Sequence, residues 1–168
     1  MSSAMSNLSK NLSLPPPSDI IDMETFQQLL ELGEEDEENR KFSCEIIVSY
    51  IAQAESTLEA MDEVLADPNK DTRQFRALGE YLKGSSSALG IRKVQLSCQR
   101  IQECVSRYNP TGHDHVTTDV AFECITALVC RVKDEFREAR AWLEDWVKAC
   151  GTGTGSSAQS QFERKICI

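Results

Sequence analysis

The sequence predicts an all-α protein, an antiparallel four-helix bundle with a short additional N-terminal helix. Three features indicate this fold. Apolar residues recur at i, i+3 and i+4 through long segments, which is the spacing of one face of a helix. The alternation of apolar and polar residues that is typical of strands does not occur. Between residues 18 and 150, glycine and proline occupy only seven positions, which suits long helices separated by short breaks.

The first helix is expected over about residues 22–32, because Asp22 is a good N-cap residue and Glu24 favours the first turn. Phe26, Leu29 and Leu30 lie on its apolar side. The second helix is expected over about residues 37–65. Its apolar face consists of Phe42, Ile46, Ile47, Tyr50, Ile51, Ala54, Leu58, Met61 and Leu65.

Three more helices are expected over about residues 72–89, 92–108 and 116–149. Because the connections are short, consecutive helices are expected to run antiparallel. The third helix has a core stripe of Phe75, Leu78, Leu82 and Leu89. The fourth has Val94, Cys98, Ile101, Val105 and Tyr108. The fifth has Val120, Cys124, Leu128, Val132, Phe136, Leu143 and Trp146, and Trp142 is also expected in the core.

The helical region forms one domain over residues 20–150. Before it, residues 1–19 are rich in serine and contain three consecutive prolines, and after it, residues 151–168 are rich in glycine and serine. Neither segment holds enough apolar residues to offset the entropy of ordering. Both are therefore expected to be flexible tails.

The chain carries 27 Asp and Glu against 18 Lys and Arg, a net charge of −9. Affinity for nucleic acid depends on cations that displace counterions, so nucleic acid is not an expected partner. No apolar run approaches the roughly 18 residues of a membrane span, and residues 1–18 lack the apolar segment of a signal peptide. We therefore expect a cytoplasmic protein, with the nucleus as a further location and no membrane contact.

The seven cysteines include no C-x-x-C pair of the kind used in zinc or dithiol chemistry. Several occupy apolar helical positions, so we expect reduced thiols packed as small hydrophobic side chains. No spacing of His, Cys, Asp and Glu specifies a metal, and no glycine-rich turn specifies a nucleotide. We expect no cofactor, and nothing in the sequence indicates an enzyme.

The segment 79–90 is the most informative stretch, because it places glycines inside a predicted helix, where each costs about 1 kcal/mol relative to alanine. At 100° per residue, Glu80, Lys83, Gly84 and Ser87 share the face that the apolar stripe leaves free. Gly84 there suits either close packing of another helix or the approach of a partner molecule. A phosphoryl group on this face would find a cation in Lys83 and a hydrogen-bond donor in Ser85.

Two stretches, Leu82-Lys-Gly-Ser-Ser-Ser-Ala-Leu-Gly90 and Cys98-Gln-Arg-Ile-Gln102, closely resemble the signature of the histidine-containing phosphotransfer (HPt) proteins. The resemblance is closest to the fungal phosphorelay intermediates and extends over about residues 20–149. It implies a helical bundle that acts as a monomeric phosphorelay intermediate of two-component signalling. The implied partners are the receiver domain of a hybrid sensor histidine kinase and the receiver domains of response regulators.

Glu80 stands where the family has its phosphoryl-accepting histidine, three residues before Lys83. An imidazole nitrogen is a neutral nucleophile that forms a transferable phosphoramidate, whereas a carboxylate is repelled by the donor phosphate. The sequence therefore indicates a variant that cannot transfer phosphate or that imitates the phosphorylated form. Two explanations of Glu80 are an engineered substitution in a phosphorelay protein and a natural paralogue that binds partners without phosphotransfer. A third alternative moves the acceptor to His113 or His115, although their position in a predicted loop favours simple solvation.

The resemblance also assigns roles to neighbouring residues. Lys83 would neutralise the phosphoryl group, Gly84 would admit the receiver domain, and Gln102 would hydrogen-bond near the acceptor. Ser85 would hold the signature helix in place. The receiver-docking surface would include Phe26, Leu29, Leu30 and Ser87, although core packing accounts equally well for the three apolar residues.

Two further alternatives stay open. The acidic run 34–38 suits a solvated helix N-terminus, which the helix dipole favours, and it also suits steering of a basic partner. The whole chain also suits an adaptor bundle whose Lys-Gly-Ser-Ser segment only packs helices. Binding of a receiver domain distinguishes the adaptor from the phosphorelay protein.

Overall fold

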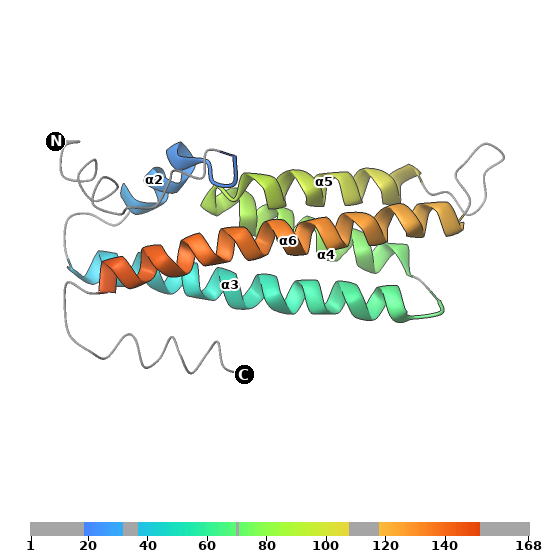
Figure 1. Cartoon of the computed structure of the whole chain (residues 1–168), viewed down its shortest axis with the longest axis horizontal. Coiled ribbons are helices and arrows are strands. Elements are labelled where there is room, and N and C mark those ends of the chain that lie inside the picture. Colours follow the sequence, from blue (N-terminus) through green and yellow to red (C-terminus); the bar gives the residue numbers. More distant parts are fainter. Residues whose placement is uncertain (1–18, 32–36, 70, 108–117, 152–168) are drawn as a thin grey trace.

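The computed structural model of the chain describes residues 19–31, 37–69, 71–107 and 118–151. Within these ranges the secondary structure is helical, which confirms the predicted all-α class. The helices are α2 (Met23–Glu31), α3 (Glu37–Ala66), α4 (Thr72–Leu89), α5 (Arg92–Arg107) and α6 (Thr118–Gly151). The four long helices lie side by side with consecutive helices antiparallel, and α2 covers one end of the bundle (Figure 1).

Each observed helix end lies within two residues of the end expected from the sequence. The two expected tails fall almost entirely outside the described residues, as do Tyr108 and the predicted loop that holds His113 and His115. None of the described helices combines the length with the apolar composition needed to cross a membrane.

Helix α4 has well-defined caps at both ends. The Asp71 carboxylate accepts a hydrogen bond from the Arg73 N–H at 2.9 Å, which satisfies a donor that the helix itself leaves free. At the other end Gly90 adopts a left-handed conformation with φ of 74°. A Cβ atom there would lie 2.7 Å from the Asp22 carbonyl oxygen, closer than any carbon tolerates. This position therefore requires glycine on grounds of both conformation and space.

The segment before α2 pairs with the connection between α4 and α5. The Asp22 N–H donates to the Gly90 carbonyl at 2.7 Å, and the Arg92 N–H donates to the Ile20 carbonyl at 2.9 Å. Between these two bonds, Ile21 and Ile91 form an isolated antiparallel bridge and are both buried. This pairing fixes where α2 begins and holds it over the end of the bundle.

Aromatic side chains connect the helices in the core. The Phe26 ring meets the rings of Trp142 and Trp146 edge to face, at centroid distances of 5.1 and 5.4 Å. Phe75 and Phe122 form a similar contact at 6.1 Å. Edge-to-face pairs add to the stabilisation that burial provides. The predicted place of Trp146 and Phe136 in the core is confirmed, and Trp142 packs against the core while partly exposed.

The predicted burial of three residues is wrong. Phe42 is 57% exposed and Val120 is 53% exposed, and Cys124 is also exposed. Phe42 and Val120 lie within the first two turns of α3 and α6, the two helices that are much longer than α4 and α5. The spacing of apolar residues identifies the inward face, but burial also needs a neighbouring element at the same height along the helix.

Candidate functional site

The outward face of α4 carries the residues that the sequence analysis placed there. Glu80, Gly84 and Ser87 are exposed, and Lys83 is half-buried. The opposite face is buried against the rest of the bundle and consists of Phe75, Gly79, Leu82, Ser86 and Leu89. The predicted division of this helix into two faces is confirmed.

A hydrogen bond joins α4 to α5 beside Glu80. The Lys83 ammonium donates to the Gln102 side-chain oxygen at 3.0 Å in a partly buried position. The Gln102 side chain also covers Gly79, where an added Cβ would lie 3.7 Å from its Cγ atom. Glu80 and Lys83 are three residues apart on one helix, a spacing that places their side chains next to each other. The structure therefore brings Lys83 and Gln102 together next to position 80.

Lys83 of α4 also interacts electrostatically with the buried thiol of Cys98 on α5. Burial first, and then the nearby Glu135 carboxylate, raise the pKa of the Cys98 thiol to about 12, although Lys83 acts in the opposite direction. Glu135 is itself buried and accepts a hydrogen bond from Arg131 at 2.8 Å through one oxygen. Its other oxygen is buried without a hydrogen-bond partner among the described residues. A cation and a carboxylate thus flank the buried thiol.

Gly84 does not serve helix packing. A Cβ atom added at this position would find nothing within 4 Å. The alternative in which Gly84 lets another helix of the bundle approach closely is therefore wrong. The helix bears the cost of a glycine at an exposed position where the fold would accept a side chain.

The three consecutive serines have different surroundings. The Ser85 hydroxyl donates to the carbonyls of Tyr81 and Leu82 at 3.2 Å each, so it is bonded within its own helix. The Ser86 hydroxyl is fully buried and shares a 2.9 Å hydrogen bond with the Tyr50 hydroxyl of α3. Ser87 is exposed.

Sequence reasoning missed the structural role of Ser86. Its position four residues after Leu82 and three before Leu89 places it on the apolar stripe, where a hydroxyl needs a partner. Burial also raises the pKa of Tyr50 well above the ordinary tyrosine value, so this phenol stays protonated. The Tyr50–Ser86 hydrogen bond ties α4 to α3.

Of the expected docking residues, Phe26 does not reach the surface. Its side chain is completely buried between Trp142 and Trp146, so its assignment to an exposed docking surface is corrected here. Leu29 and Leu30 pack against the core while partly exposed.

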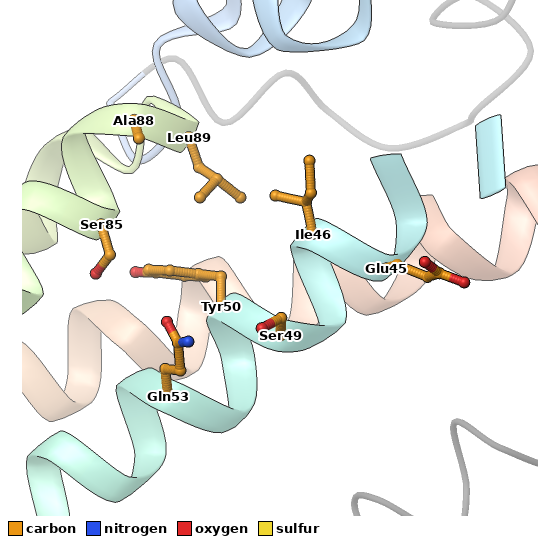
Figure 2. Close-up of a pocket in the computed structure, with 8 residues that line it drawn as sticks. All are labelled: Glu45, Ile46, Ser49, Tyr50, Gln53, Ser85, Ala88 and Leu89. Atoms are coloured by element: carbon orange, nitrogen blue, oxygen red, sulfur yellow. The ribbon is translucent and has the colours of Figure 1, made fainter. Parts of the chain in front are cut away.

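A hollow of about 360 Å³ lies between α3 and α4, next to the serine segment. Figure 2 shows the Tyr50 side chain extending across it from α3 toward α4. Its remaining lining residues are Glu45, Ile46, Ser49, Gln53, Ser85, Ala88 and Leu89.

The other candidates are outside the site or outside the described residues. His113, His115 and most of the acidic run 34–38 are not among the residues that the structure describes. Within the described ranges, no three His, Cys, Asp or Glu side chains form a group that could hold a metal ion.

No protein-family model matches the chain. Curated relatives do. Multistep phosphorelay regulator 1 of Schizosaccharomyces pombe is 35% identical over 128 residues, which cover 76% of this chain and 42% of that protein. Phosphorelay intermediate protein YPD1 of Saccharomyces cerevisiae is 35% identical over 86 residues, 51% of this chain and 49% of that protein. The chain spans about half the length of the curated relatives it matches.

Solved structures share the fold. The maize histidine-containing phosphotransfer protein ZmHP2 superposes with a TM-score of 0.71 and 22% identity, over 89% of this chain and 99% of that one. Ypd1 of Saccharomyces cerevisiae superposes with a TM-score of 0.66 and 24% identity, over 79% and 97%. The chain is thus a homologue of the phosphorelay intermediates and has the fold of the histidine-containing phosphotransfer proteins.

Proposed function

We propose that the chain docks receiver domains of a two-component phosphorelay through the outward face of α4, without accepting phosphate at position 80. The partners would be the receiver domain of a hybrid sensor histidine kinase and those of response regulators. The observation that carries the proposal is the open Gly84 beside the Lys83–Gln102 hydrogen bond. The yeast relative Ypd1 has been crystallised with the receiver domain of the response regulator Ssk1.

The proposal accounts for Gly84 by the close approach of a partner. An exposed helical glycine exposes backbone that a partner's loop can reach, which any side chain would obstruct. Lys83 would place a positive charge beside the incoming phosphoryl oxygens, and Gln102 would hold that ammonium in position. Ser87, Leu29 and Leu30 would border the contact, and Ser85 would hold the signature helix in place through its bonds to the helix backbone.

Glu80 would give the outward face of α4 a negative charge without accepting a phosphoryl group. A carboxylate that attacked a phosphorylated receiver would approach a group of like charge, and its product would be an acyl phosphate instead of a phosphoramidate. A permanent negative charge next to Lys83 also imitates the phosphorylated state of a histidine. We therefore propose that this chain either cannot transfer phosphate or imitates the phosphorylated form. Residues 20–150 would form the domain with this role, and the protein would act in the cytoplasm and nucleus.

Binding is tested by calorimetry with the receiver domains of the hybrid kinases and response regulators from the source organism. We expect the chain to bind at least one, and Gly84→Gln to weaken that affinity at least tenfold by obstructing the contact. The matched control is Ala127→Gln, which places the same side chain at an exposed position of α6, outside the proposed face of α4. Equal affinities for Gly84→Gln and the parent would contradict the proposed face.

Transfer is tested with the same receiver domains carrying radioactive phosphate. The parent chain and Glu80→Gln are expected to acquire no label, and Glu80→His is expected to acquire it. If Glu80→His binds a receiver but takes no phosphate, the chain is better described as a natural inactive paralogue. If neither the parent nor Glu80→His binds any receiver, the adaptor-bundle alternative is favoured and the proposal is wrong.

A further inference from the structure

Two thiols from different helices meet on the side of α5 that faces α6. Cys104 of α5 and Cys124 of α6 have their Sγ atoms 2.8 Å apart. Cys104 is half-buried and Cys124 is exposed, although the apolar spacing predicted Cys124 in the core. The two residues are 20 positions apart in the chain, so tertiary packing brings them together.

We propose that Cys104 and Cys124 form an oxidation site that closes into a disulfide between α5 and α6. A disulfide bond is about 2.05 Å long, so the two sulfurs need to approach by less than about 1 Å. Both residues lie in regular helix, and α5 packs directly against α6, so the sulfurs are held near each other before any oxidant arrives.

The chemistry needs a two-electron oxidant, for which hydrogen peroxide is sufficient. The exposed Cys124 sulfur attacks a peroxide oxygen, the O–O bond breaks, and a sulfenic acid and one water result. The Cys104 sulfur then attacks the sulfenic sulfur. The S–S bond forms, and the hydroxyl group leaves as a second water with the Cys104 proton. One peroxide is reduced to two waters while two thiols become one disulfide.

The surroundings of the two sulfurs set the order of these steps. Burial, and then the contact with Cys124, raise the pKa of Cys104 to about 11, so Cys104 is a thiol at neutral pH. Cys124 is the more exposed of the two sulfurs, so a peroxide from solvent reaches it more readily. Cys124 is therefore the first to be oxidised, and Cys104 is the resolving thiol.

Two other cysteines each lack one of the two requirements, which are exposure to solvent and contact with a second thiol. Cys98 is completely buried, so solvent oxidants do not reach it. Cys130 is exposed on α6, but it makes no contact with another thiol in the part of the chain that the structure describes. Cys130 is therefore the matched control, because it is a solvent-exposed thiol on the same helix.

The test uses the full chain, reduced and then treated with hydrogen peroxide. After remaining thiols are alkylated, tryptic digestion without reduction is expected to yield residues 101–107 linked to residues 108–131, with one thiol lost from each of these two peptides. Cys130→Ser is expected to keep this cross-link, and Cys124→Ser to lose it. Cys44 and Cys150 also hydrogen-bond to each other, and a disulfide between them would give a different peptide pair, which is scored separately.

A second measurement keeps the test independent of any variant. Closing a loop of about 20 residues with a disulfide commonly stabilises a domain of this size, so the oxidised chain should melt about 6–12 °C higher and return to the original Tm after dithiothreitol. Circular dichroism of Cys124→Ser checks that this variant folds. Oxidation that leaves peptides 101–107 and 108–131 unlinked, or that links separate chains, would overturn the proposal. The outcome does not depend on receiver binding or on Glu80.

Discussion

Gly84 within α4 and Gly90 at the C-terminal cap of that helix occupy opposite situations. At Gly90 a Cβ atom would lie 2.7 Å from the Asp22 carbonyl oxygen, and the backbone has a positive φ, so the fold requires glycine. At Gly84 a Cβ atom would find nothing within 4 Å and the helix continues normally. The same residue type therefore has a structural explanation at one position and none at the other. Because the glycine at position 84 lowers helix stability and the fold does not require it, we infer that it is kept for binding a partner.

The contrast extends to the two faces of α4. The inward face connects to α3 through Ser86 and Tyr50, and to α5 through Gly79, which lies against Cys98 and Gln102. The outward face presents Glu80 and an open backbone to solvent. Substitutions on the inward side should change the free energy of unfolding, whereas those on the outward side should change partner binding.

The largest effect is expected for Gly90→Ala. A left-handed backbone costs an ordinary residue about 1–2 kcal/mol, and the added Cβ must also displace the Asp22 carbonyl, so we expect a loss of about 3 kcal/mol or more. Urea denaturation measures this loss. Because the Gly90 carbonyl anchors the segment before α2, the Trp142 and Trp146 fluorescence should also change. A loss below about 1 kcal/mol would contradict the structural role of Gly90.

The next effect concerns alkaline pH. The folded protein holds the Cys98 thiol at a pKa of about 12, above the roughly 8.5–9 of a free cysteine, so above pH 9 the unfolded chain releases a proton that the native chain keeps. Stability from this group is complete below pH 9 and is lost between about pH 9 and 12, with a slope approaching about 1.4 kcal/mol per pH unit.

Cys98→Ala tests this pH dependence. Urea unfolding at pH 7.5, 9 and 10 should show a shallower decline for Cys98→Ala than for the parent, whatever its stability at neutral pH. Cys130→Ala, at an exposed position of α6, should decline in parallel with the parent. Identical slopes for all three chains would show that Cys98 is not buried as described.

A smaller effect is expected at the Tyr50–Ser86 hydrogen bond. Tyr50→Phe leaves the fully buried Ser86 hydroxyl without its partner, which should cost about 1–3 kcal/mol in urea denaturation. Tyr50→Phe combined with Ser86→Ala removes both polar groups, so the double variant should be more stable than Tyr50→Phe alone. If the two costs instead add without coupling, the hydroxyls do not depend on each other.

The helices were predictable because local rules determine them. Apolar spacing and the Gly and Pro positions located every described helix end to within two residues. Burial was less predictable, because it depends on what lies opposite. Phe42 follows the apolar spacing of α3 and is still exposed, whereas Phe26 is buried by Trp142 and Trp146, which follow it by more than 110 positions.

The candidate site divides in the same way. The common face of Glu80, Lys83 and Gly84 follows from the period of one helix, and the sequence predicted it. The resemblance to a family implied that Gln102 lies near the acceptor position, but its contact with Lys83 was not predicted, because periodicity does not orient one helix against another. The pairing of Cys104 with Cys124 was not predicted at all, since it depends on the register between α5 and α6.

The smallest effect on stability, and of opposite sign, is expected for Gly84→Ala. Alanine has the higher helix propensity and its Cβ enters open space, so the variant should gain up to about 1 kcal/mol in urea denaturation. Gly79→Ala is the comparison, because its Cβ would make only ordinary van der Waals contacts at 3.7–3.8 Å with α5 and should gain a similar amount. A loss of stability for Gly84→Ala would mean that the fold does need this glycine. A gain that accompanies weaker receiver binding would support the proposal that Gly84 serves a partner, in contrast to Gly90, which serves the fold.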